Sequence, residues 1–261
     1  MHLRPDHAEN DLRVLRKLIR ENALGQMTTA IPSPTHPFLQ TSHIPFVLDI
    51  EDESSETELG RLRCHMARQN PQSKAMMESL TENPALENVI EQDVLVIFTS
   101  PVQHYVTSKF YTETKLGSGK VVPTWNYAAA QVYGRAKVYF DSKSDESVNF
   151  LQTQMEDLSH QCETEIMGYT GGDAPVEWKV SDAPSRYVEL LRKAIIGVEI
   201  TITRMEGKFK MSQEMGVGDR EGVIKGFARL NSETGGAMSK LVKERCDQKD
   251  EAKAAAKSAA Q

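Results

Sequence analysis

The sequence predicts an α+β fold in which one antiparallel β-sheet closes into a barrel, with helices at its edges. The apolar run 94–98 has the length and the β-branched content of a buried central strand. Residues 198–205 alternate apolar and polar side chains, which is typical of a half-buried strand. Because neither an internal repeat nor a clear linker divides the chain, we expect these strands to share one sheet.

Further strands are expected along the first half of the chain. A proline-rich turn over 32–37 separates two β-type segments and predicts a hairpin. An acidic, serine-rich run over 51–58 is most simply a solvated loop. The strand candidates are 27–31, 42–50, 59–65, 105–111 and 121–140.

Helical spacing of apolar residues predicts the remaining elements. It extends over 11–21, 71–80, 145–166 and 185–196. We therefore expect one domain over residues 1–235, with a helical excursion near 144–196. A Lys/Ala-rich tail over 236–261 should be exposed or helical.

Composition argues against several classes of function. A net charge of -6 makes nucleic-acid binding an unlikely role, since such surfaces need many Lys and Arg residues. The absence of a long apolar window and of a secretory signal predicts a cytoplasmic protein without a membrane partner. Three widely spaced cysteines and singly scattered histidines predict neither a disulfide framework nor a metal site.

The end of the 59–65 strand is the first candidate for chemistry. Asn70 and Pro71 mark a helix start, and free N–H groups at such a start bind anions together with guanidinium groups. The segment thus predicts a phosphate site, against the simpler interpretation of solvated basic residues beside an ordinary helix start. Its basic residues are Arg61, Arg63, His65 and Arg68.

Two more segments carry suitable groups. Trp125, Asn126 and Tyr127 offer two aromatic faces and an amide, which suits a planar heteroaromatic ring. Lys208 and Lys210 alternate along the chain and would share one strand face, where one anion could meet both. A polar edge strand protected by lysines explains the second pattern equally well.

In order and spacing, these segments resemble the PaiB family of FMN-binding split-barrel proteins, which is related in fold to pyridoxamine 5'-phosphate oxidase. The resemblance covers about residues 1–227 and includes the runs 42–46, 65–71, 120–127, 207–213 and 219–223. It departs from the family pattern at Ser100-Pro101 and over 107–111, where an aromatic wall is altered.

The resemblance implies an antiparallel split β-barrel with peripheral helices, and a homodimer with FMN at the subunit interface. It implies a flavin-dependent oxidoreductase using NAD(P)H or another small-molecule substrate, with catalytic residues unknown. Two alternatives stay open: a haem-binding or haem-processing split barrel, and a PaiB-like transcriptional regulator without catalysis. The cofactor contacts expected from residues and resemblance together are His43, His65, Met66, Ala67, Arg68, Asn70, Thr99, Trp125, Asn126, Tyr127, Lys208, Lys210, Ser212 and Gln213.

Overall fold

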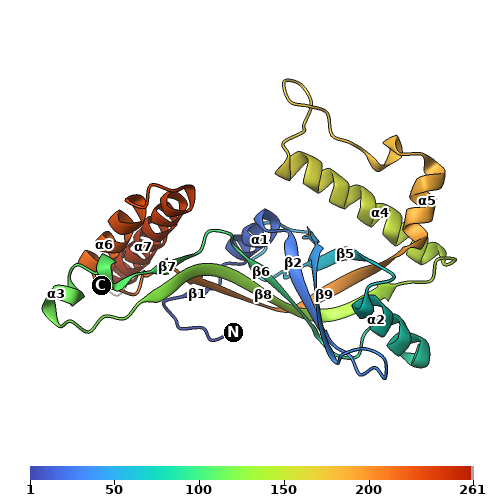
Figure 1. The fold of residues 1–261 in the computed structure, drawn as a ribbon, viewed down its shortest axis with the longest axis horizontal. Coiled ribbons are helices and arrows are strands. Elements are labelled where there is room, and N and C mark those ends of the chain that lie inside the picture. The colour runs from blue at the N-terminus through green and yellow to red at the C-terminus, as the bar shows by residue number, and fades with distance from the viewer. Residues whose placement is uncertain (260–261) are drawn as a thin grey trace. The chain divides into compact units, whose positions relative to one another are not determined.

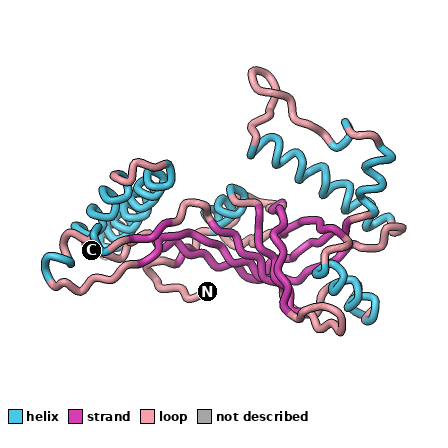
Figure 2. The backbone as a smooth tube through the Cα atoms, viewed as in Figure 1, coloured by secondary structure: helices cyan, strands magenta, loops and turns pink. Residues whose placement is uncertain are grey.

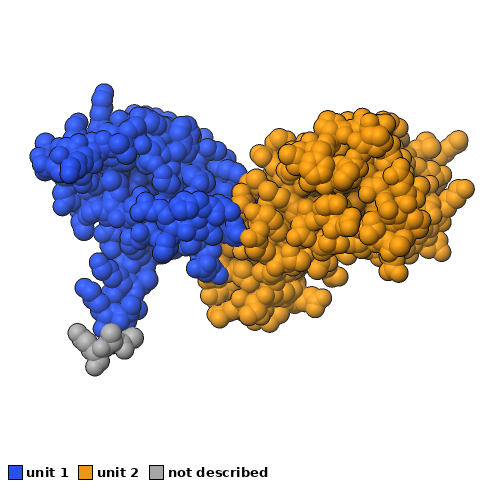
Figure 3. All heavy atoms as spheres, turned by 90° about the horizontal axis from the view of Figure 1, so that it is seen from below, with its two compact units in different colours: residues 1–10, 99–130, 206–261 blue, residues 11–98, 131–205 orange. Residues whose placement is uncertain are grey.

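The computed structural model describes residues 1–259, which divide into two compact units (Figure 3). The unit that we call the central unit contains residues 11–98 and 131–205. The terminal unit contains residues 1–10, 99–130 and the chain from 206 onward. Each unit is described by itself.

One sheet of nine strands contains most of the β structure (Figures 1 and 2). Its main path runs β3-β2-β6-β8-β9-β5-β4, while β1 pairs with β9 and β7 pairs with β8. The pairs β2–β3, β2–β6, β4–β5 and β5–β9 are antiparallel, which confirms the predicted α+β fold with an antiparallel sheet. The strands are β1 (Ala8–Glu9), β2 (Leu24–Ala30), β3 (Leu39–Pro45), β4 (Val47–Asp49), β5 (Arg61–Ala67), β6 (Val94–Thr99), β7 (His104–Val106), β8 (Thr124–Tyr139) and β9 (Ile195–Lys210).

Alternation along the strands builds the core of the central unit. In β5, Leu62, Cys64 and Met66 are buried, while the residues between them are more exposed. The same period of two buries every second residue of β6, and much of β9 follows it. The predicted strands 94–98 and 198–205 are therefore present, and β9 extends beyond the prediction at both ends.

Four helices belong to the central unit and match the predicted helical segments. They are α1 (Leu12–Glu21), α2 (Pro71–Glu82), α4 (Asp145–Gln161) and α5 (Ser185–Lys193). A π-helical turn, Cys162–Ile166 (η3), continues α4, and short 3₁₀ turns lie at Pro84–Leu86 (η1) and Val180–Asp182 (η4). The helix predicted to reach residue 196 ends earlier, because Ile195 already pairs with Ala67 of β5.

The terminal unit contains a helical pair, α6 (Val217–Ala228) and α7 (Glu233–Ala259). Phe227 of α6 is fully buried and lies edge-on to the ring of Phe110, with ring centroids 5.3 Å apart. Met238 and Val242 are fully buried on one face of α7. This unit also contains a 3₁₀ turn at Ser108–Phe110 (η2) and the short helix α3 (Thr114–Gly117).

One strand prediction for this unit holds only in part. The segment 105–111 is a strand only at its start and then turns into η2. Residues 219–223 lie inside α6, where the Asp219 carboxylate accepts hydrogen bonds from the Glu113 and Thr114 N–H groups. Among residues 1–259, no helix has both the length and the apolar character that crossing a membrane requires.

Candidate cofactor site

The predicted cofactor residues fall into two groups, one in each unit. The group in the central unit, which we call the Arg68 segment, consists of His43, His65, Met66, Ala67, Arg68 and Asn70. The group in the terminal unit, which we call the lysine cluster, consists of Thr99, Trp125, Asn126, Tyr127, Lys208, Lys210, Ser212 and Gln213.

The two lysines of the lysine cluster lie on strand β9, which continues to Lys210. Their spacing of two places both on one strand face, as predicted. The ammonium group of Lys210 donates a hydrogen bond to the Thr124 hydroxyl at the start of β8. The ammonium group of Lys208 donates to the His2 carbonyl at 3.0 Å and lies 5.5 Å from the centre of the Tyr127 ring.

Burial and like charges act together on Lys210. Burial lowers its pKa, and the positive charges of Lys208 and Arg4 lower it further, while Glu214 opposes them. Lys208 and Arg4 therefore lie close enough to repel the Lys210 ammonium group, and the Glu214 carboxylate offsets part of this repulsion. A bound anion would offset more of it, so the cluster can accept an anion.

Asn126 and Ser212 form the buried polar part of the cluster. The Ser212 hydroxyl donates to the side-chain oxygen of Asn126 at 3.1 Å, and both residues are almost fully buried. The Nδ2 group of Asn126 is buried without a hydrogen-bond partner among the residues that the structure describes. Ser212 has a φ of 60°, a left-handed conformation that non-glycine residues rarely adopt outside functional or tightly determined sites.

The Gln213 side chain forms hydrogen bonds with nearby backbone groups. Its amide nitrogen donates to the Phe209 carbonyl at 2.5 Å and to the Asp6 carbonyl at 2.9 Å. Its side-chain oxygen accepts from the Met211 N–H at 2.7 Å. The Gln213 side chain thus holds the end of β9 against the N-terminal segment.

The aromatic residues of the cluster are on β8, within the predicted strand 121–140. Trp125 and Tyr127 therefore share one face, and Asn126 points to the opposite one. Trp125 is half exposed, and its indole N–H donates to the Gln103 side chain at 3.2 Å. Thr99 ends β6 and is exposed.

The Arg68 segment has the predicted strand-to-helix geometry. Strand β5 ends at Ala67, and α2 begins at Pro71 with Asn70 as its N-cap. The Asn70 side-chain oxygen accepts from the Gln72 N–H at 2.9 Å, and its amide nitrogen donates to the Ser42 hydroxyl at 3.0 Å.

The basic side chains of this segment bond largely to the protein itself. The Arg68 guanidinium donates to the Phe140 carbonyl and, at 3.2 Å, to the sulfur of Met77. Arg63 donates to the Asp49 carboxylate at 2.7 Å and to that of Asp157 at 2.8 Å. Hydrogen bonding to Asp49 raises the pKa of Arg63 despite its burial. Arg63 therefore has a structural role.

The remaining residues of this group differ in exposure. Met66 is buried in the core, whereas Ala67 and His43 are exposed. Burial lowers the pKa of His65, and its Nδ1 atom is buried without a hydrogen-bond partner among the described residues. Near pH 7, His65 therefore contributes a neutral hydrogen-bonding group and no positive charge.

Comparison with known proteins tests the predicted family. A family model described as "Putative FMN-binding domain" matches residues 1–204. The chain belongs to this FMN-binding family. The predicted resemblance to PaiB-like split-barrel proteins is thereby confirmed, and FMN is the cofactor that the family indicates.

Two fungal relatives match the chain along nearly its whole length. An uncharacterised protein of Aspergillus fumigatus is 55% identical over 261 residues, covering 96% of this chain and 99% of its own. One from Emericella nidulans is 57% identical over 257 residues, with the same coverage. The protease synthase and sporulation protein PAI 2 of Bacillus subtilis is 26% identical over 155 residues, covering 59% of this chain and 64% of its own.

Solved structures of low sequence identity also align. A flavocytochrome from Azotobacter vinelandii is 11% identical with a TM-score of 0.44, covering 80% of this chain and 72% of that one. A conserved hypothetical protein from Mycobacterium tuberculosis is 12% identical with a TM-score of 0.45, covering 84% and 98%.

The lysine cluster fits an FMN cofactor on its own chemistry. A phosphate dianion needs neighbouring cations and donors, which Lys208, Lys210 and Ser212 supply. A flavin ring needs an aromatic face, and Tyr127 offers one. Sequence reasoning missed Arg4 and Thr124 as parts of the cluster, although Thr124 lies within the family-like run 120–127.

Proposed function

We propose that this protein is a flavin-dependent oxidoreductase that binds FMN and acts as a homodimer in the cytoplasm. Membership of the FMN-binding family supports the cofactor. The observation that carries the proposal is the lysine cluster, where the half-buried Lys210 has two cationic neighbours.

The phosphate contact is assigned to Lys208 and Lys210. Both face the same way on β9, and an anion between them would offset the repulsion that lowers the Lys210 pKa. Arg68 is the weaker candidate, because its guanidinium is already engaged by Phe140 and Met77. His43, His65, Met66, Ala67, Asn70 and Thr99 stay predicted cofactor contacts.

The ring contact is assigned to the face of β8 that presents Trp125 and Tyr127. Their aromatic side chains would stack on the isoalloxazine and exclude water from it. FMN supplies hydride or electron transfer when it is bound, and the protein orients it and tunes its electronics. NAD(P)H or another small molecule is the proposed electron donor.

The decisive experiment is spectroscopic. Purified protein should show flavin absorbance, or should quench FMN fluorescence saturably on titration. It should then oxidise NAD(P)H aerobically, and light scattering coupled to size exclusion should give twice the chain mass of 29.2 kDa. A protein that takes up no FMN would refute the cofactor proposal. If FMN binds but neither NADH nor NADPH is oxidised, the result would support the PaiB-like regulator instead.

A further inference from the structure

An apolar cavity of about 320 Å³ lies in the central unit beside the Arg68 segment. Helix α4 forms one wall, strand β5 contributes His65, and the segment from Trp178 to Leu191, which includes α5, forms the other wall. The side chains that dominate the lining are Met155, Leu158, Trp178, Tyr187, Val188 and Leu191.

The lining carries no charged side chain to pair with a charged ligand. Its Ser159 hydroxyl already donates to the Trp178 carbonyl at 3.4 Å. Burial raises the pKa of the Cys162 thiol, so that group stays neutral near pH 7. The lining therefore favours an uncharged molecule, because moving a charge into such a site is costly.

His65 lines the cavity without offering it a polar group. Its Nδ1 atom is buried without a hydrogen-bond partner among the described residues, and an atom buried in this way has no surface that a ligand in the cavity could reach. The cavity therefore selects its ligand by shape and apolar contact.

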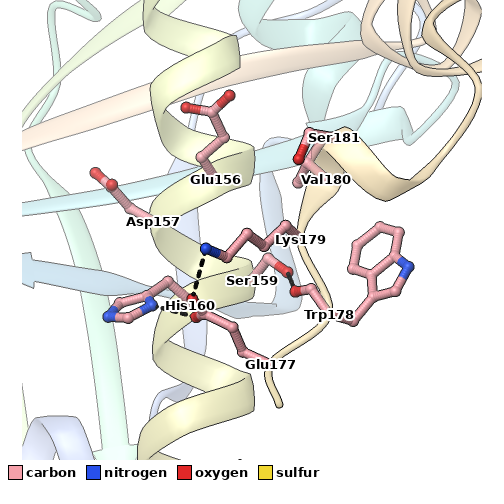
Figure 4. A pocket seen from close by; sticks show the side chains of 9 residues that line it. All are labelled: Glu156, Asp157, Ser159, His160, Glu177, Trp178, Lys179, Val180 and Ser181. Carbon is pink, nitrogen blue, oxygen red and sulfur yellow. Dashed lines mark hydrogen bonds and ion pairs between the residues drawn. The ribbon is translucent and has the colours of Figure 1, made fainter. Parts of the chain in front are cut away.

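A second cavity beside the apolar one contains charged side chains that already pair with one another. Glu177 accepts from His160 at 2.5 Å and lies 3.3 Å from the Lys179 ammonium group. Figure 4 shows these three side chains together, with the Trp178 indole directed away from them. The apolar cavity is thus the better candidate for a binding site.

The volume sets the size of the ligand. Sites for small molecules in proteins have volumes of roughly 300 to 1,000 Å³, and an apolar cavity of roughly 150 Å³ can hold benzene. A cavity of about 320 Å³ therefore suits two or three aromatic rings. We propose that it binds a small uncharged aromatic molecule through apolar contact with the side chains that line it.

The test uses the uncharged fluorescent probe N-phenyl-1-naphthylamine on the full chain. It should bind saturably at one site per chain, with energy transfer from tryptophan. Excess FMN should leave this signal unchanged. The absence of saturable binding would refute the site, and so would displacement of the probe by FMN, which would place it in the flavin site.

Filling the cavity should abolish binding. Met155→Trp enlarges a lining side chain of α4, and Thr153→Trp adds the same group on an exposed position of that helix. With the probe excited directly, its binding to Met155→Trp should be at least 10-fold weaker than to the wild type. Its binding to Thr153→Trp should equal that of the wild type. Ala183→Trp fills the cavity from the opposite wall and is the replacement if the first variant does not fold. Equal binding by the filled and control variants would refute the location.

Discussion

At the scale of single residues, burial and hydrogen bonding shift the pKa values of basic groups in opposite directions. Lys210 and His65 are both partly withdrawn from water, and burial is the main cause that lowers the pKa of each. Arg63 is also partly buried, yet hydrogen bonding to Asp49 raises its pKa. Basic residues that look alike in the sequence therefore have different roles in the fold.

Lys210→Ala should weaken FMN binding about 10- to 100-fold, the loss expected for a charge-assisted hydrogen bond. Fluorescence titration measures this directly. Lys225→Ala is the control, because Lys225 is exposed on α6 and pairs with Glu221 at 2.8 Å. Equal affinities for the two variants would show that the phosphate lies elsewhere.

His65 should make the folded state less stable in mild acid. The ordinary histidine pKa is 6.5, and burial lowers it in the folded protein. Below pH 6.5 the unfolded chain therefore binds a proton that the folded chain does not, so the free energy of unfolding falls as the pH falls. Urea denaturation at pH 7 and pH 5.5 should show a smaller fall for His65→Phe than for the wild type. Parallel falls would contradict this.

At the scale of elements, the departures from prediction have local causes. The predicted strand 42–50 divides into β3 and β4, because Pro45 has no N–H for a ladder and Phe46 donates its N–H to the Ala23 carbonyl at 2.9 Å. Strand β4 then pairs with β5, so this half of the predicted segment forms no hairpin with β2.

Strands β8 and β9 also approach closely within the central unit. A Cβ atom on Gly134 would lie 2.3 Å from the Thr201 carbonyl oxygen. Gly134→Ala should therefore destabilise the protein by about 1 to 3 kcal/mol, the usual range for overpacking. Thermal unfolding measures the loss.

The control for that substitution is Gly236→Ala, at a helical position of α7 with open space around the added carbon. It should be neutral or stabilise by up to about 1 kcal/mol, because alanine is the better helix former. A loss of similar size in both variants would show that the β8–β9 approach is not the cause.

At the scale of the whole molecule, overall charge and local charge differ. The chain has a net charge of -6, yet Arg4, Lys208 and Lys210 gather near one another. A local cluster of this kind gives an acidic protein a defined place for an anion without a general affinity for polyanions.

FMN should stabilise the whole protein through linkage. At about 100 times its dissociation constant, a ligand that binds only the folded state adds about 2.7 kcal/mol. For a chain of this size, that corresponds to a rise in Tm of about 5 to 10 °C. Scanning fluorimetry measures it, with riboflavin as the control because it lacks the phosphate. An equal rise with riboflavin would contradict a phosphate contact at the lysine cluster.

The sequence by itself determined features that depend on near neighbours. Strict alternation predicts which face of β9 is buried, and it places Lys208 and Lys210 together. The Asn70-Pro71 pair predicts the start of α2, since a capping side chain and a proline suit the first helical turn. The order of family-like runs predicted the FMN-binding family.

Only the tertiary structure decided how distant segments use these groups. It engages Arg68 with the Phe140 carbonyl, leaves the Asn126 amide buried without a partner among the described residues, and places His65 beside an apolar cavity. Each of these depends on packing between segments far apart in the chain. Local periodicity carries no information about such packing, because it states which face is buried and not what lies against it.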